Sequence, residues 1–324
     1  MKNLSPPTEI EDQIRILKER GMSFIDEERA KKYIRYIGYK RLSWYWTRFY
    51  KSEEKFIDNL KFEDVLSVYI FDRKLRALFL EVSERVELCL KTLFSDTLSL
   101  KHDALWYLNA SFFNTKTDKY YKDNVLHEEK IDHGTLMHQI SDELDRHKNN
   151  SAILKNFKSI YSSKIPSWDL FQLLTFGKFS RVLELTNGIE SKEFYDLFSL
   201  PKAVFDNWVE CMVAVRNICA HYGLFYARDF SNKPKNLAKS DKRAFSQVFD
   251  KETQNKFFAQ FFVFAYFLFK ISPTSGWVKR VISEIESIIS KTSLISFESL
   301  GFPEDWKENA VFKEMLKDKE EKLF

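Results

Sequence analysis

Residues 62–100 have the sequence FEDVLSVYIFDRKLRALFLEVSERVELCLKTLFSDTLSL, the longest helical pattern in the chain. Apolar side chains recur along it at steps of three or four residues, a spacing that places them on one face of an α-helix. This stripe consists of Phe71, Leu75, Leu78, Val82, Val86 and Leu93, with one longer step at its end. The 324 residues include only 8 glycines and 7 prolines, so residues that favour tight turns are scarce. The sequence therefore predicts an all-α fold.

The composition predicts the nature of the core and the cellular compartment of such a protein. Phenylalanine is abundant, with 31 residues, which predicts helices packed around aromatic cores. The net charge of +4 is compatible with an anionic partner but does not require one. Cys89, Cys211 and Cys219 lie singly on helical segments without zinc-binding spacing, so we expect reduced thiols in a cytoplasmic protein. Residues 1–10 lack the apolar run of a secretory signal.

Residues 257–269 form a membrane-like apolar run that only Gln260 interrupts. The run is shorter than the about 20 residues that a bilayer crossing needs. A helix that is apolar on all sides is usually buried in a protein core. We therefore expect a core helix and no membrane partner, with a membrane-active toxin built on this run as the rival interpretation.

The segment Val-Arg-Asn-Ile-Cys-Ala-His-Tyr, residues 215–222, carries the most reactive combination of side chains. Arginine stabilises phosphate-like negative charge, and histidine transfers protons near neutral pH. On a regular helix, the directions of Arg216 and His221 differ by about 140°. A long arginine side chain or a distorted helix end would let them converge. The alternative is a salt-bridge arginine and a histidine that the helix dipole favours at a C-terminal end.

Residues 39–46 interleave basic and aromatic side chains. Tyr39, Lys40, Arg41 and Trp44 are candidates to bind single-stranded RNA, because aromatic rings stack on bases while basic groups contact phosphates. The alternative interpretation is an aromatic helix packed against the core, with its basic side chains in solvent.

Several charged residues lie beside the apolar stripe of residues 62–100, among them Arg73, Arg76, Glu84 and Glu87. They either form ion pairs or hold the arginine or histidine of an active site in place. Residues 101–163 contain five of the six histidines, but neither a helical metal pair nor an HExxH sequence. We therefore expect no metal and no cofactor.

Motifs along nearly the whole chain resemble the Abi (abortive infection) proteins of the AbiD/AbiF type, an Abi-like bacterial family within the HEPN superfamily. The matching segments are residues 37–46, 71–76, 84–87, 166–168, 174–180, 208, 216–222, 224–225 and 301–306. HEPN ribonucleases carry Arg-polar-x(3 to 5)-His, which residues 216–221 match and which we call the signature. The family often has His-His where this chain has His221 and Tyr222.

The resemblance implies a HEPN-type helical bundle and a metal-independent endoribonuclease toxin of phage defence. His221 would transfer protons, Arg216 would stabilise the phosphorane charge, and Asn217 would position groups by hydrogen bonds. Tyr222 joins Arg73, Arg76 and Glu84 as a candidate to support them. The resemblance also implies an RNA substrate, a small noncoding RNA or a protein as antitoxin, and a homodimer, since HEPN sites usually combine two signatures.

The expected organisation has three parts. Residues 1–60 form an N-terminal helical region, and residues 61–275 form a HEPN-like helical core with a polar, helical insertion near 101–163. Residues 276–324 form a C-terminal helical extension. The alternative function is a non-catalytic RNA-binding module of a defence system, in which the signature only contacts phosphate.

Overall fold

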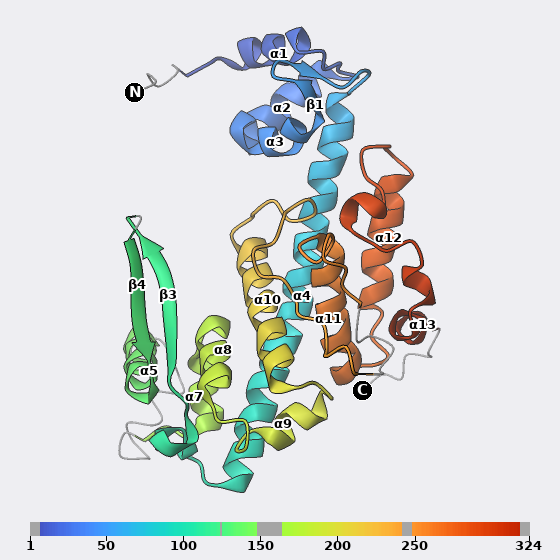
Figure 1. The fold of residues 1–324 in the computed structure, drawn as a ribbon. Helices are drawn as coiled ribbons and strands as arrows, with labels where there is room; N and C mark the ends of the chain where they lie inside the picture. Colours follow the sequence, from blue (N-terminus) through green and yellow to red (C-terminus); the bar gives the residue numbers. More distant parts are fainter. Residues whose placement is uncertain (1–6, 124, 148–163, 242–247, 318–324) are drawn as a thin grey trace.

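The helix predicted over residues 62–100 is α4, Phe62–Lys101, in a computed structural model that describes residues 7–123, 125–147, 164–241 and 248–317. Its 40 residues correspond to a length of about 60 Å, and it runs through most of the molecule (Figure 1). The N-terminal helices lie at one end of α4, while α10, α11 and α12 lie along it. The structure is mostly α-helical, which confirms the predicted class.

The other elements follow in chain order. The helices are α1 Ile10–Glu19, α2 Glu27–Ile37, α3 Tyr39–Trp46, α5 His133–His147, α7 Ser167–Leu173, α8 Phe176–Leu185, α9 Lys192–Leu197, α10 Lys202–Ala220, α11 Phe257–Ile271, α12 Trp277–Ile289 and α13 Ala310–Leu316. Short 3-10 turns are Thr47–Phe49, Trp106–Leu108, Ala110–Phe112, Glu298–Leu300 and Trp306–Glu308. The strands are β1 Tyr50–Ser52, β2 Lys55–Phe56, β3 Lys116–Lys122 and β4 Val125–Ile131.

Aromatic side chains fill the core around α4, as the phenylalanine content predicts. Phe79, in the middle of α4, is fully buried, and its ring centroid lies 4.7 Å from that of Phe225 and 5.2 Å from that of Phe264 on α11. Phe94 forms a second cluster nearer the C-terminal end of α4, with ring centroids 4.9 Å from Phe194 and 5.9 Å from Phe179. These two clusters fix α8, α9 and α11 against α4.

The apolar run at residues 257–269 is α11, and it is a core helix. Every residue from 257 to 268 is buried, including Gln260, whose amide donates to the carbonyl of Asn232 at 2.9 Å. None of the helices in the described part of the chain has an apolar stretch of the length that a bilayer crossing requires. The expectation of a core helix is confirmed.

The insertion near residues 101–163 is not purely helical, so this part of the prediction is wrong. Its described residues contain an antiparallel hairpin, β3 and β4, which stands out from the body beside α5 (Figure 1). Lys122 pairs with Val125, and Asp123 has a φ of 51°, so the hairpin turns within two residues. The strands hold β-favouring Tyr120, Tyr121 and Val125, but polar residues surround them and conceal the pattern. Residues 148–163 lie outside the described part.

Candidate functional site

The signature lies on the last turns of α10, which stays helical to Ala220. His221 follows as the C-terminal cap residue, and its N–H donates to the carbonyl of Asn217 at 3.0 Å. Asn217 and His221 are exposed, while Arg216 is half-buried. Because the helix is regular between residues 216 and 220, Arg216 and His221 leave it in directions that differ by about 140°.

The chain reverses sharply after His221. The N–H of Gly223 donates to the carbonyl of Ile218 at 2.7 Å, and Tyr222 has a φ of 58°, in the left-handed region. This arrangement satisfies carbonyls at the helix end, although glycine usually occupies the left-handed position. At Gly223, a β-carbon would lie 2.9 Å from Cγ2 of Ile218 and 3.2 Å from its carbonyl oxygen, so a larger residue would force Ile218 or the turn to shift. The turn therefore fixes where His221 and Tyr222 lie.

A buried polar cluster on α4 holds the segment that follows this turn. Asp72 is fully buried and pairs with Arg76, which is 4% exposed. The Asp72 carboxylate accepts from the N–H of Tyr226 at 2.7 Å and from the hydroxyl of Tyr45 at 2.7 Å. Burial raises the pKa of the Asp72 carboxyl, and Arg76 and these hydrogen bonds offset part of the rise.

Three arginines donate to the carbonyls of the same segment. Arg76 Nη1 donates to the carbonyl of Gly223 at 3.2 Å. From the N-terminal region, Arg41 donates to the carbonyl of Tyr222, and Arg48 donates to the carbonyl of Ala227. The chain beyond His221 is thus tied to both α4 and the N-terminal helices.

Arg216 lines a cavity of about 380 Å³ between α4, α7 and α10. The other lining residues are Leu80, Ser83, Glu84, Glu87, Leu88, Lys91 and Gln172. Arg216 Nη1 donates to the amide oxygen of Asn217 at 3.2 Å, and its guanidinium forms no ion pair with another described residue. If Arg216 were an ordinary salt-bridge residue, an acidic side chain should pair with it. None of the described residues does so.

The predicted supporting residues occupy different places. Arg76 is buried and contacts the segment after the signature, whereas Arg73 is exposed to solvent. Glu84 is exposed on the rim of the cavity beside Arg216. Tyr222 follows His221 directly, and 71% of its surface is exposed.

The candidate RNA-binding residues of α3 divide into two groups. Lys40 and Trp44 are exposed, and the guanidinium of Arg41 lies 4.6 Å from the centre of the Trp44 ring. Tyr39 is half-buried and packs edge-on against Trp46, with ring centroids 5.0 Å apart. Burial also raises the pKa of the Tyr39 hydroxyl. Lys40 and Trp44 are thus more accessible to a ligand than Tyr39, whereas Arg41 is half-buried like Tyr39.

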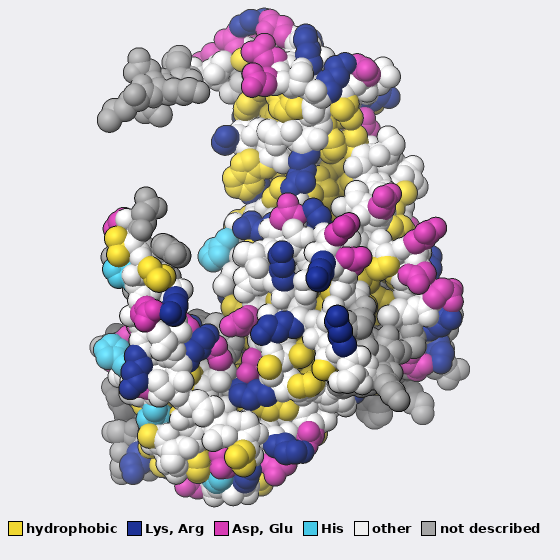
Figure 2. Space-filling model, viewed as in Figure 1, with side chains coloured by type: hydrophobic (Ala, Val, Ile, Leu, Met, Phe, Trp, Pro, Cys, Tyr) yellow, Lys and Arg dark blue, Asp and Glu magenta, His cyan; other side chains and the backbone are white. Residues whose placement is uncertain are grey.

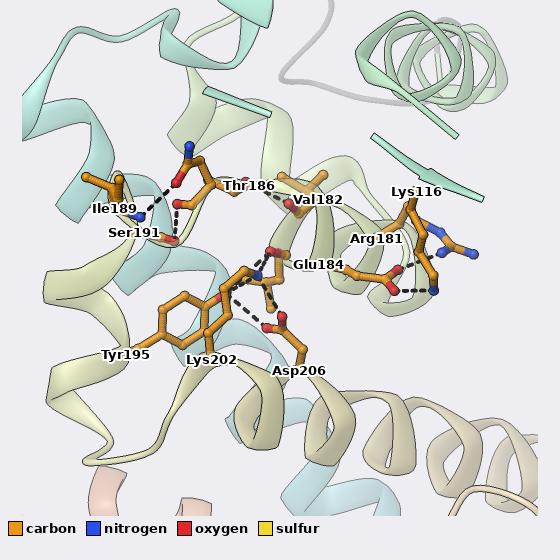
Figure 3. Close-up of polar contacts among 12 residues, drawn as sticks. Lys116, Arg181, Val182, Glu184, Thr186, Ile189, Ser191, Tyr195, Lys202 and Asp206 are labelled. Atoms are coloured by element: carbon orange, nitrogen blue, oxygen red, sulfur yellow. Dashed lines mark hydrogen bonds and ion pairs between the residues drawn. The ribbon is translucent and has the colours of Figure 1, made fainter. Parts of the chain in front are cut away.

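The start of α10 is held by a second polar cluster (Figure 3). Lys202 pairs with Asp206 at 2.6 Å and donates to the carbonyl of Leu183 at 2.7 Å. The Tyr195 hydroxyl donates to Asp206 at 2.9 Å. Burial raises the pKa of the Asp206 carboxyl, and the attraction of Lys202 offsets part of the rise. Both ends of the signature helix are therefore fixed to neighbouring elements.

Among the described residues, no cluster of metal-binding side chains lies near the signature. Across residues 7–123, 125–147, 164–241 and 248–317, no three histidine, cysteine, aspartate or glutamate side chains come together as a metal would need. The three cysteines are free thiols; Cys211 and Cys219 are buried, and Cys89 is half-buried.

A family model described as Abi-like protein matches residues 32–227, which is more than half of the chain. The chain belongs to the Abi-like protein family. The matched region includes α3, α4 and α10, and so contains the signature, the Asp72–Arg76 pair and the arginines that hold residues 222–227. Neither the curated proteins nor the solved structures contain a significant match.

Sequence reasoning missed two side chains that organise the site of this Abi-like protein. Asp72 and Tyr45 join Arg76 in one buried cluster, with Arg76 Nη1 lying 3.2 Å from the Tyr45 hydroxyl. The available signal was the spacing of Asp72 and Arg76, four residues apart and next to the apolar residues Phe71 and Leu75. Charges at that spacing beside a buried stripe are positioned to pair within the core.

Proposed function

We propose that this Abi-like protein is a metal-independent endoribonuclease of the HEPN type. Its family membership supports a role in abortive infection, the defence of bacteria against phage. RNA is the proposed substrate, and a small noncoding RNA is the proposed antitoxin. Cleavage of RNA explains how such a protein would act as a toxin.

The proposed reaction needs only the RNA and the side chains of the signature. A ribose 2'-hydroxyl loses its proton and attacks the adjacent phosphorus, while the 5'-oxygen of the next nucleotide leaves and takes up a proton. The products are a 2',3'-cyclic phosphate and a 5'-hydroxyl. His221 transfers protons, and Arg216 stabilises the charge of the phosphorane. Asn217, which accepts from Arg216 at 3.2 Å, orients the guanidinium.

One observation carries this proposal. The side chains of Arg216 and His221 are free to bind a ligand, while the backbone of α10 that bears them is held in place. Within the described residues, the Arg216 guanidinium has only the amide of Asn217 as a partner, and the exposed His221 side chain has no hydrogen-bond partner. In contrast, the backbone that carries them is held by Lys202 at one end of α10 and by Arg76 beyond the other. The fixed backbone sets where both side chains begin, and no ion pair would have to be broken for Arg216 to bind a phosphate.

Basic residues provide a surface for RNA on the same side of the molecule. Lys and Arg side chains gather over the middle of the face shown in Figure 2, where α10 and the segment that follows it lie. The exposed basic residues of that segment are Arg228, Lys233, Lys235 and Lys239. Contacts between such groups and phosphates supply affinity that does not depend on sequence.

Purified protein should cut single-stranded RNA in the presence of EDTA and leave 2',3'-cyclic phosphate and 5'-hydroxyl ends. The reaction proposed above gives this end chemistry, and it involves no metal ion. The measurement is sequencing of the cut RNA with adaptors that distinguish the end groups. Complete loss of cleavage in EDTA with recovery on adding a divalent metal would contradict the mechanism, and binding without any cleavage would favour the RNA-binding module.

The active protein should be a homodimer of two 38.6 kDa chains. Within one chain, Arg216 and His221 point about 140° apart, so a second signature related by two-fold symmetry is proposed to complete the site. Sedimentation velocity at micromolar concentration, after bound RNA has been removed, measures the mass. A monomer that cuts RNA at the full rate under the same conditions would contradict the prediction.

A further inference from the structure

Tyr222 combines two unusual properties. Its backbone has a φ of 58°, a conformation that side chains with a β-carbon disfavour and that glycine or asparagine adopts more easily. Its side chain is 71% exposed, so packing does not account for a large aromatic residue either. A strained position that keeps an exposed ring beside a candidate catalytic residue points to a use of that ring in solvent.

Arg41 connects Tyr222 to a second exposed aromatic residue. The guanidinium of Arg41 donates to the carbonyl of Tyr222, and it lies 4.6 Å from the centre of the Trp44 ring. Trp44 is 41% exposed. Arg41 therefore contacts both the ring of Trp44 and the backbone of Tyr222, and so brings two residues with exposed rings to the end of the signature helix, next to His221.

Flat rings and guanidinium planes bind unpaired nucleobases by stacking, and the positive charge favours the neighbouring phosphates. In a duplex, each base is already stacked on its neighbours, so a side chain can stack on it only by breaking that stacking, at a cost in free energy. We propose that Tyr222, Arg41 and Trp44 form a binding site for an unpaired nucleobase next to the phosphate that is cut. The inference rests on the proposed ribonuclease function, and it assigns the side chains that would hold one base of the single-stranded substrate beside the phosphate that is cut.

The test compares Tyr222→Gly with Tyr222→Phe. Glycine relieves the left-handed backbone and keeps the carbonyl that Arg41 contacts, so this variant should melt at an equal or higher temperature than the original protein. It lacks the ring, and it should bind a single-stranded RNA with about ten-fold lower affinity, since a stacked base contributes on the order of 1–3 kcal/mol. Tyr222→Phe keeps the ring and should bind like the original protein.

The probe is a fluorescent 2'-O-methyl RNA oligonucleotide, whose binding is measured by anisotropy. This RNA has no free 2'-hydroxyl, so its binding does not depend on cleavage. Unchanged affinity in Tyr222→Gly would overturn the nucleobase site, as would an equal loss in Tyr222→Phe. If the original protein binds the probe but does not cut unmodified RNA, the ribonuclease proposal fails. If it cuts RNA while Tyr222→Gly binds normally, the nucleobase site alone fails.

Discussion

His221→Ala should lower the rate of RNA cleavage by about 10²–10⁴-fold, which is the usual contribution of a general acid or base. His221 is exposed at the end of α10, and no described side chain bonds to its ring, so the melting temperature should stay the same. The measurement is the initial rate of cutting of a labelled single-stranded RNA, together with thermal unfolding of the same preparation.

His138→Ala is the matched control for this prediction. The His138 side chain is 77% exposed on α5, where it pairs with Asp142 at 3.2 Å, so its loss should leave cleavage unchanged. Full activity of His221→Ala, in a preparation free of other nucleases, would exclude His221 from proton transfer. A drop in melting temperature that accompanies the loss of activity would instead indicate a structural role.

Asp72→Ala should lower the free energy of unfolding by about 3–5 kcal/mol, because it leaves the buried Arg76 guanidinium without its counter-charge. It also removes the acceptor for the backbone N–H groups of Phe225 and Tyr226. RNA cleavage should fall as well, since the segment beyond His221 loses its attachment to α4. Urea unfolding followed by circular dichroism measures the change in stability.

Two control variants show whether the loss of stability comes from an unpaired buried charge. The double variant Asp72→Leu with Arg76→Met removes both charges together and should lose less stability than Asp72→Ala alone. Asp196→Ala breaks an exposed pair with Lys192 at the same spacing of four residues, and it should change stability little. If Asp72→Ala unfolds at the same urea concentration as the Asp196→Ala control, the buried cluster does not hold the site.

The helices that are longest or most apolar could be predicted from the sequence, because a single pattern determines them. The apolar stripe of α4 and the continuous apolar run of α11 each require burial, and their observed bounds lie close to the predicted ones. The hairpin of β3 and β4 could not be predicted in the same way. In the described part of the chain, its two strands form a sheet of their own and β4 is mostly exposed, so no alternation of apolar and polar residues marks them.

The candidate site could be predicted only in part, for a physical reason. The chemistry of Arg216 and His221 is visible in their residue types, but their surroundings come from segments distant in sequence. Arg41 contacts Tyr222 from 181 residues away, and Asp72 contacts Tyr226 from 154 residues away. Such contacts depend on how α3, α4 and α10 pack, which local patterns do not specify. Likewise, only the φ of Tyr222 distinguishes it from an ordinary exposed tyrosine.

The unbroken course of α4 fixes the spacing between two parts of the site. Arg76 contacts the segment after His221, and Glu84 lines the cavity beside Arg216, so one helix sets both positions. A single residue inserted between Arg76 and Glu84 would rotate everything beyond it by about 100° and shift it by about 1.5 Å. The two halves of the helix would then no longer fit the same α10. The number of residues in α4 between Arg76 and Glu84 is therefore fixed by its contacts with α10 and with the segment that follows α10.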